Sequence, residues 1–490
     1  MNAVASATSN AGPIAFFRCL ALPAQPIPPP FLGLKSLAVG REHNPNIGIA
    51  TADQPTAPPA ATPELPDGPD WSVRRATWNW WRQPIRTMEQ CQARYGDMFT
   101  IRIVHEGTWV FVSDPEAVKQ IFTGDPDLLH AGEANIVLLP VLGEHSVLLL
   151  DEPEHMAQRK LMLPPFHGRR MHAYGEVMAR AAAEEIDRWP TDEPVRMRPR
   201  MQSVTLEVIL RAVFGLDEGE RLSELRDQLR GTLNLLSSTR RVLFMIMLGP
   251  QRLRRFGPFR RQIEGIDRLI YEEIALRRRA EDLAERDDIL SLLLQATHED
   301  GRPMSDRELR DELMTLLVAG HETTATALSW AVELLARHPA ELERLQADAA
   351  SGDGAYVDAV IKETLRLRPV VSLVLRRLVE PMEIGGRLLP AGVSVAPSIY
   401  LLHRRPEIYP EPERFRPERF LDQQPGTYTW IPFGGGVRRC LGGAFAEFEM
   451  SVVLRELVTR RRLRPAGDRP ERSVRSTITN VPSRGAEVFA

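Results

Sequence analysis

One helical pattern of more than thirty residues, running from Ser305 to Pro339, constrains the fold of this chain more than any other feature. Ser305 and Glu308 form a capping-box pattern at its start, and Pro339 marks its end. At 1.5 Å per residue, such a helix is about 50 Å long, which is enough to cross an entire domain. The pattern therefore predicts a large domain built around one central helix.

The middle of this segment, residues 319–324 (Ala-Gly-His-Glu-Thr-Thr), lacks the aliphatic residues expected of a buried helix. Glycine in a helix interior costs about 1 kcal/mol relative to alanine, and threonine is a weak helix former. One interpretation is a helix crossing that needs a small residue, with Glu322 in solvent. The other is that helix stability is given up for a functional acid and hydroxyl. This segment alone does not decide between the two.

The rest of the chain divides unequally. Residues 1–70 hold 13 of the 40 prolines, which predicts a Pro/Ala-rich, extended and largely disordered N-terminal arm. No Pro/Gly linker and no internal repeat interrupts residues 71–490, which we interpret as one domain. Within it, residues 97–113 show the pattern of a β-hairpin, Asp114 is the expected cap of the next helix, and short strands return at 381–398. Helical patterns dominate elsewhere, so we expect a mainly α fold with small β-sheets.

Composition excludes several classes of protein. A net charge of -3 and a pI near 6.5 argue against a nucleic-acid binder. The cysteines are three, widely and irregularly spaced, which fits neither a disulfide framework nor a zinc site and favours reduced thiols in the cytoplasm. The apolar stretch at 12–24 contains Arg18 and Pro23 and is shorter than the roughly 20 residues of a membrane span. We therefore expect no stable membrane anchor and no secretory signal.

The third cysteine, Cys440, lies in a glycine-dense loop, FGGGVRRCLGG, just before a helical pattern. Free amides at a helix N-terminus favour a thiolate, and Arg438 and Arg439 add positive charge. The glycines at 434–436 leave the backbone free to approach a flat, bulky group. Four interpretations are considered: a phosphate-binding loop, a cysteine hydrolase, a buried structural thiol, and thiolate ligation of haem iron. The first lacks a Lys-Ser/Thr after the glycines, and the second lacks a recognisable His and Asn/Asp context.

Taken together, four motifs resemble those of the cytochrome P-450 superfamily. The Cys440 loop matches F-G-x-G-x-R-x-C-x-G position by position, and KETLRL contains the E-x-x-R motif. FRPERF, residues 415–420, resembles the meander motif of that family, and residues 319–324 resemble its A-G-x-E/D-T-T segment. The motifs follow in the family's order and cover the part of the chain after residue 71. The resemblance implies a soluble, bacterial-type cytochrome P-450 fold, with haem between the long central helix and the cysteine loop.

The resemblance also implies particular haem contacts. Cys440 would be the proximal ligand of the iron of haem b, and Phe433 would pack near its sulfur. The residues implied as propionate-binding groups are His155, Arg159, Arg376 and Arg438, with Arg377 as an alternative to Arg376. Several cationic donors facing two carboxylates would be favourable electrostatically.

Two further groups of residues follow from the same resemblance. Glu322 and Thr323 would be the catalytic acid and hydroxyl that deliver protons, whereas His321 stands at a variable position and receives no role. A structural charge network is expected from Glu363, Arg366 and Arg419, with Arg414 as a less favoured substitute for Arg419.

The implied activity is that of a haem-thiolate monooxygenase, which hydroxylates or epoxidises a hydrophobic small molecule with O2. A fatty acid, terpenoid, steroid or polyketide would each fit. Because about fifty residues follow Cys440, electrons would come from a separate ferredoxin and a ferredoxin reductase that uses NAD(P)H, and a basic face including Arg438, Arg439, Arg169 and Arg170 is one candidate docking surface. A solvated charge run is the alternative. We expect a cytoplasmic monomer.

Two alternatives to this function are considered: an H2O2-dependent peroxygenase and a non-catalytic, haem-based binding or sensing protein. The acid-alcohol pair argues against both. Predicted substrate-pocket walls are residues 135–150, 316–320 and the apolar run after the E-x-x-R helix. The methionine-rich stretch at 242–248 is either a flexible entrance or a core-facing helix.

Overall fold

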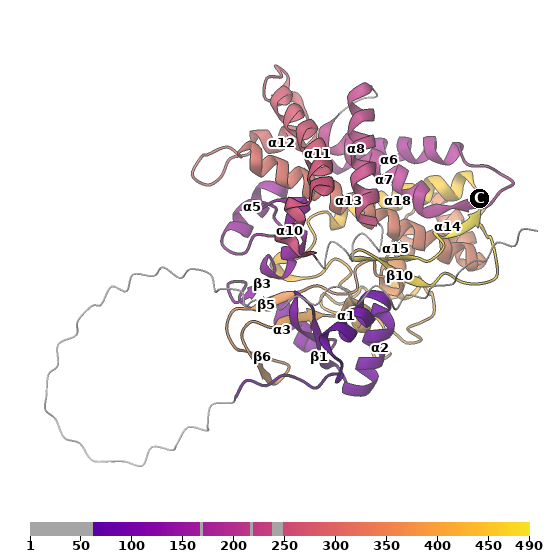
Figure 1. The fold of residues 1–490 in the computed structure, drawn as a ribbon. Helices are drawn as coiled ribbons and strands as arrows, with labels where there is room; N and C mark the ends of the chain where they lie inside the picture. Colours follow the sequence, from indigo (N-terminus) through magenta and orange to yellow (C-terminus); the bar gives the residue numbers. More distant parts are fainter. Residues whose placement is uncertain (1–61, 167–169, 216–218, 238–247) are drawn as a thin grey trace, which may run out of the picture. The chain divides into compact units, whose positions relative to one another are not determined.

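The computed structural model of the protein describes residues 62–166, 170–215, 219–237 and 248–490 (Figure 1). Most of the expected N-terminal arm lies outside the described residues, as does all but the last residue of the methionine-rich stretch. Helices dominate the described part, and its strands form four small sheets. The predicted fold class, mainly α with small β-sheets, is confirmed.

Helix α13, Asp306–Arg337, is the predicted central helix. The capping box is present: the Glu308 amide donates to Ser305 Oγ (3.2 Å), and the Ser305 amide donates to Glu308 Oε2 (2.7 Å). The helix stops before Pro339, which begins α14 (Pro339–Ser351). Both predicted ends are thus confirmed, because caps and prolines act on the backbone within a few residues.

The other helices surround α13 and bury it along most of its length (Figure 1). Its most extensive packing is against α7, Met197–Phe214. The further helices of this part are α5 (Glu154–Met162), α6 (Arg170–Asp187), α8 (Glu220–Ser237), α10 (Pro250–Arg255), α11 (Gly257–Arg277), α12 (Ile289–Gln295), α15 (Ala355–Leu367) and α18 (Gly443–Arg460). One large apolar cluster runs through them, so α13 is held on several sides.

A five-stranded sheet with the order β1-β2-β8-β5-β3 packs with α1 (Val73–Arg82), α2 (Pro84–Tyr95) and α3 (Pro115–Thr123), at a distance in the fold from α8 and α11 (Figure 1). Its strands are β1 (Met98–Ile103), β2 (Gly107–Val112), β3 (Leu129–His130), β5 (Arg376–Leu378) and β8 (Ser394–Pro397). The predicted hairpin is β1 and β2, which pair antiparallel, and the Asp114 side chain caps α3 by accepting from the Ala117 amide (2.8 Å). β5 pairs antiparallel with β8, which sets the position of Arg376 opposite Val395.

The remaining strands form smaller sheets: β4 (Val195–Arg196), β12 (Glu487–Phe489) and β9 (Arg464–Pro465) in one, β10 (Ser473–Ser476) with β11 (Thr479–Pro482) in another, and β6 (Met382–Ile384) with β7 (Arg387–Leu389) in a third. Residues just before the expected domain boundary at 70 contact β7 of the third small sheet and β1 of the five-stranded sheet. The Glu64 amide donates to the Leu388 carbonyl (3.0 Å), and the Thr100 amide donates to the Asp67 carbonyl (3.0 Å).

Candidate active site

The Cys440 loop is a closed turn that leads into α18. The Cys440 amide donates to the Phe433 carbonyl (3.0 Å), and the Phe433 ring lies against Gly443, the first residue of α18. Gly434 and Gly436 adopt the left-handed region, with φ of 68° and 66°. Glycine is needed at these two positions because side-chain residues rarely adopt that conformation.

Packing against α3 explains two of the glycines. A Cβ at Gly435 would lie 2.5 Å from the Phe122 ring, and one at Gly436 would lie 2.1 Å from the Phe122 carbonyl oxygen. These two glycines are therefore required by the contact with α3, and the expectation that they open the backbone to a flat group stays a prediction. Gly434 is less crowded, since a Cβ there would be 3.7 Å from Val374.

The Cys440 thiol is surrounded by protein and nevertheless has accessible surface. Burial raises the pKa of the thiol. The Cys440 residue nevertheless has solvent-accessible surface. The two facts agree if the sulfur lines an internal space. A hydrogen bond from the Gly442 amide and the charges of Arg159 and Arg439 lower the pKa, but less than burial raises it. The helix end and the arginines thus act in the direction that the sequence predicts, towards a thiolate, while burial opposes it; a coordinated metal ion would favour the thiolate further.

A second accessible surface lies in the middle of α13. Ala319 is exposed, and Leu316, Gly320 and Thr323 are partly exposed, although the flanking residues of the helix are buried. These four positions are spaced i, i+3, i+4 and i+7, so they share one face of the helix. Of the predicted pocket wall at 316–320, Leu316, Ala319 and Gly320 belong to this face, whereas Leu317 is buried. Of the wall predicted at 135–150, Ile136, Val137 and Leu148 are exposed.

The structure separates Glu322 from Thr323. The Thr323 hydroxyl donates to the Ala319 carbonyl (2.6 Å) on the accessible face. The Glu322 carboxylate instead faces α7, where it accepts from Arg198 Nη2 (2.5 Å) and Gln202 Nε2 (2.5 Å). No hydrogen bond between the two residues is present in the described part of the chain. Glu322 is only 15 % exposed at its side chain, so the interpretation that placed it in solvent was wrong.

Gly320 is explained by the helix crossing. A Cβ at this position would lie 3.0 Å from Ile209 Cδ1 of α7, which is tighter than ordinary side-chain packing. His321 is also directed at α7, since its Nε2 lies 3.1 Å from the Gln202 carbonyl oxygen. Burial lowers the pKa of His321 to about 4, so the imidazole is neutral at pH 7. The small-residue interpretation is thus confirmed at Gly320, while the functional interpretation of Glu322 and Thr323 stays a prediction.

Sequence reasoning missed Arg198 and Gln202, the two partners of Glu322. They stand four residues apart on α7 and therefore share a helix face. Arg198 Nη2 also donates to Ser476 Oγ (3.2 Å) at the end of β10. Little in the sequence marks this pair, because α7 contains other charged residues such as Arg200, Glu207 and Arg211, and Glu322 lies more than a hundred residues away in the chain.

Cationic groups gather near the cysteine loop. Arg376 is 7 % exposed. Among the described residues, its side chain forms one hydrogen bond, from Nη1 to the carbonyl of its neighbour Leu375 (2.7 Å). Burial, and after it the charge of Arg438, lowers the pKa of the Arg376 guanidinium to about 10. The predicted alternative, Arg377, forms an ion pair with Glu133 (3.3 Å) and is 40 % exposed at its side chain. Arg376 is therefore the one of the two that points inward.

The other implied propionate-binding residues lie in the same region. Arg438 Nη2 donates to Asp151 Oδ1 (3.0 Å), and Arg159 Nη2 donates to the Arg439 carbonyl (2.7 Å). His155 is buried, with Nδ1 2.6 Å from Glu152 Oε1. Burial lowers the pKa of His155, and the positive charge of Arg438 lowers it further, while the hydrogen bond with Glu152 raises it.

This donor set suits a haem. Arg376 is a buried guanidinium without a carboxylate partner in the described residues, and it lies near the charge of Arg438. Guanidinium N–H groups without a partner could donate to the two propionates of a haem. An enclosed thiol with accessible surface could act as the iron ligand. The residues present therefore fit the group that the family motif implies.

The E-x-x-R motif forms a fully buried network. Arg366 binds Glu363 in bidentate fashion (2.7 and 2.8 Å), and both side chains are 0 % exposed. Arg419 donates to Glu363 from Nε (3.2 Å), and the Arg416 amide donates to the same carboxylate (2.8 Å). Arg414 contributes only its carbonyl oxygen, which accepts from Arg366 at 3.4 Å. The carboxylate thus accepts hydrogen bonds from three residues in two segments, α15 and residues 416–419.

The suggested basic face is not assembled as expected. Arg438 is 9 % exposed at its side chain and pairs with Asp151, so it adds no charge to an outer surface. Arg439 is exposed. Arg169 and the side chain of Arg170 lie outside the described residues.

Comparison with known proteins agrees with this geometry. The family model for cytochrome P450 matches residues 66–487. A Mycobacterium tuberculosis protein named "Putative cytochrome P450 135B1" is 46% identical over 430 residues, covering 86% of this chain and 91% of that protein. Cytochrome P450 137 of the same organism, which carries the same qualifier, is 40% identical and covers 82% of this chain and 85% of its own length.

Two solved structures share the fold. The retinoic acid bound cyanobacterial CYP120A1 has a TM-score of 0.75 at 24% identity, covering 87% of this chain and 99% of that one. The cytochrome P450DA heme domain has a TM-score of 0.72 at 23% identity, covering 86% and 96%. The chain belongs to the cytochrome P450 family, as the motifs predicted. The family consists of haem monooxygenases that use O2, and in the described residues no helix has the length and apolarity to cross a bilayer.

Proposed function

We propose that the protein is an O2-dependent monooxygenase that hydroxylates or epoxidises a hydrophobic small molecule at haem b, with electrons from a ferredoxin and its NAD(P)H-dependent reductase. The observation that carries the proposal is the accessible face of α13, where Thr323 stands in the centre of an otherwise buried helix. A haem carrier without turnover would not need a hydroxyl there. We propose in addition a cytoplasmic, monomeric protein whose substrate is a fatty acid, terpenoid, steroid or polyketide.

In this proposal, Cys440 is the iron ligand, and Arg376, Arg438, Arg159 and His155 hold the propionates. When bound, haem supplies the activation of O2. Phe433 closes the loop under the sulfur through its carbonyl contact with the Cys440 amide. The Glu363–Arg366–Arg419 network fixes the segment that precedes the loop, because it joins α15 to residues 412–419.

Protons would be held by two groups with different surroundings. The Thr323 hydroxyl uses its hydrogen on the Ala319 carbonyl, so the oxygen lone pairs remain free to accept from a water on the accessible face. The Glu322 carboxylate is held by Arg198 and Gln202 on the α7 side. Transfer from Glu322 towards Thr323 therefore requires either a bridging water or rotation of the Glu322 side chain away from one of these partners.

Labelled oxygen provides the direct test. The haem-loaded protein is supplied with a ferredoxin, its reductase, NAD(P)H and a panel of lipids under 18O2, and products are analysed by mass spectrometry. We expect one product to carry a single 18O atom. Product formed with H2O2 but not with O2 and reductant would make the protein a peroxygenase. Lipid binding, seen as a Soret shift, without product under either condition would favour a sensor.

A further inference from the structure

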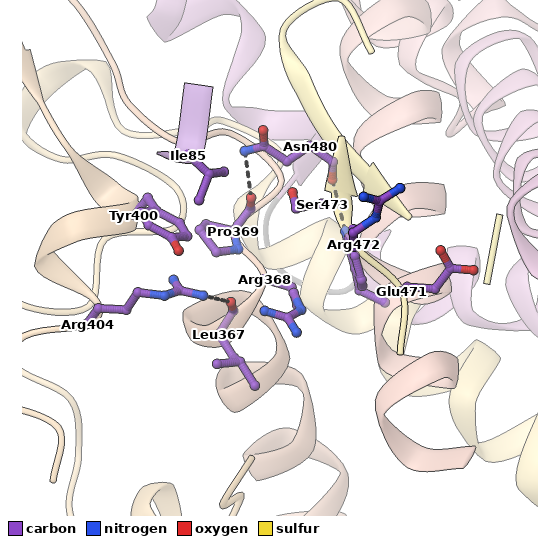
Figure 2. A pocket seen from close by; sticks show the side chains of 11 residues that line it. Ile85, Leu367, Arg368, Pro369, Tyr400, Arg404, Glu471, Arg472, Ser473 and Asn480 are labelled. Atoms are coloured by element: carbon purple, nitrogen blue, oxygen red, sulfur yellow. Dashed lines mark hydrogen bonds between the residues drawn. The ribbon is translucent and has the colours of Figure 1, made fainter. Parts of the chain in front are cut away.

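A pocket separate from the haem-site residues is formed where the end of α15 meets the β10–β11 hairpin and α2 (Figure 2). Three arginines line it: Arg368, Arg404 and Arg472. Ser473 and Asn480 add polar groups. None of the residues assigned to the haem or to proton delivery lines this pocket.

The side chain of Arg368 forms no hydrogen bond and no ion pair with any residue that the structure describes, and its Nε is buried. Its guanidinium lies over the ring of Trp330, with Cζ 5.2 Å from the ring centroid. Burial lowers the pKa of Arg368, and the charge of Arg404 lowers it further. A partly buried cation of this kind is costly unless something pairs with it.

Arg404 has two buried donor atoms without a hydrogen-bond partner among the described residues, Nη1 and Nε, and only Nε is in an ion pair. Its Nη2 donates to the Leu367 carbonyl (2.7 Å), its Nε is 2.9 Å from Glu413, and its Cζ is 3.7 Å from the Tyr400 ring centroid. The buried Nη1 has no partner among the described residues. Figure 2 shows both guanidinium groups beside the end of α15.

The acidic lining residue does not neutralise these charges. Glu471 accepts from Ser483 Oγ (2.8 Å), the Arg484 amide (2.8 Å) and the Ala486 amide (3.2 Å). In Figure 2 its carboxylate is turned away from Arg368. Glu413 balances Arg404, and no described residue pairs with the side chain of Arg472. Arg368, which is partly buried, and Arg472, which is exposed, are therefore without an acidic partner at this pocket.

We infer that this pocket binds a phosphate group, with Arg368 as its principal ligand. A phosphate group carries close to two negative charges at pH 7, which matches the two arginines without an acidic partner. Its oxygens also match the planar fork of a guanidinium, and stacking on Trp330 already restricts the orientation of that fork. The Ser473 hydroxyl and the free Nη1 of Arg404 are the further donors available.

The test uses Arg368→Gln in the haem-loaded full chain, with Arg74→Gln as a matched control, because Arg74 is exposed and lies outside the pocket. Thermal unfolding is followed in chloride and in inorganic phosphate at equal ionic strength. We expect phosphate to raise the unfolding midpoint of the parent and of Arg74→Gln, but not of Arg368→Gln. In chloride alone, Arg368→Gln should be at least as stable as the parent, because an unpaired charge has been removed.

Calorimetric titration with inorganic phosphate should show binding about tenfold to a hundredfold weaker in Arg368→Gln, and an intermediate loss in Arg368→Lys, which keeps the charge without the fork. Glucose 6-phosphate distinguishes free phosphate from a phosphate carried by an organic molecule, and binding of either supports the site. Equal destabilisation of Arg368→Gln in chloride and phosphate would assign Arg368 a packing role on Trp330 only. A phosphate response that persists in Arg368→Gln, or a response to acetate alone, would also overturn the inference.

Discussion

Two regions that contain polar groups, one around Glu363 and one along the middle of α13, are built in opposite ways. Around Glu363, the carboxylate and the Arg366 guanidinium are fully buried and paired through several hydrogen bonds. Along the middle of α13, by contrast, Ala319 and Thr323 face accessible space, and the Thr323 oxygen has lone pairs to spare. The first arrangement fixes backbone segments relative to one another, whereas the second keeps polar capacity for molecules that come and go.

The cysteine loop combines a tightly packed backbone with an accessible side chain. Its backbone is packed against Phe122 and closed by the Phe433 carbonyl, yet its thiol has accessible surface. The arginines near it are similar, since Arg438 is paired with Asp151 while Arg376 has no acidic partner among the described residues. A side chain left unpaired in such surroundings is costly, so its presence indicates a ligand.

The largest effect is expected from Cys440→Ala, which removes the proposed iron ligand. The reduced, CO-bound parent should show the strongly red-shifted Soret band of a thiolate-ligated haem, and the variant should lose it completely. Cys91→Ala is the matched control, because Cys91 is a buried free thiol in α2. A spectrum that Cys440→Ala leaves unchanged would place the ligand at another residue.

Glu363→Ala tests the paired region. It would leave the buried Arg366 guanidinium without its carboxylate, at a cost of about 3–5 kcal/mol in the free energy of unfolding. Glu411→Ala is the control, since Glu411 pairs with Arg414 and Arg416 at the surface and is 57% exposed at its side chain. The free energy of unfolding, from chemical denaturation, and the haem content are measured for both variants. Normal holoprotein yield and stability in Glu363→Ala would mean that the network is not needed for the fold.

Thr323→Ala tests the open region. We expect haem, substrate and O2 to bind as in the parent, while NAD(P)H oxidation yields hydrogen peroxide in place of product. Because positioned proton transfer contributes about 10²–10⁴-fold in acid–base catalysis, the ratio of product to reductant consumed should fall sharply.

Thr324→Ala is the control for this comparison, because Thr324 is buried and lies about 100° further round the helix. The ratio of product to reductant consumed in Thr324→Ala should stay near that of the parent. If Thr323→Ala couples reductant to product as well as the parent does, another proton path operates.

A smaller effect is expected from Gly435→Ala, which probes the packed side of the loop. The added methyl would lie 2.5 Å from the Phe122 ring, and relief of such overlap costs about 1–3 kcal/mol. Gly442→Ala places the same methyl where no atom lies within 4 Å, so it should be nearly neutral. Unfolding in denaturant measures the stability of both variants. Equal stability of the two variants would show that α3 shifts to accommodate the added methyl group.

Much of this could be predicted from sequence because the relevant signals are local. The ends of α13 follow from Ser305, Glu308 and Pro339, which act on the backbone within one turn. The hairpin before Asp114 and the helix after it are likewise short-range patterns. The cysteine loop and the E-x-x-R motif are contiguous residues whose spacing is characteristic of the family, so they identified it before any fold was known.

Only the tertiary structure decided which groups meet. Glu322 turns towards Arg198 and Gln202 on α7, Arg376 rather than Arg377 points inward, and Gly435 is required by Phe122. The unpaired state of Arg368 likewise depends on Glu471 and Glu413 being engaged elsewhere. Hydrogen bonds and steric contacts join atoms a few ångströms apart in space, and the residues that carry them here are separated by up to several hundred positions in the chain. Sequence patterns determined the elements and the family, and packing determined the partners.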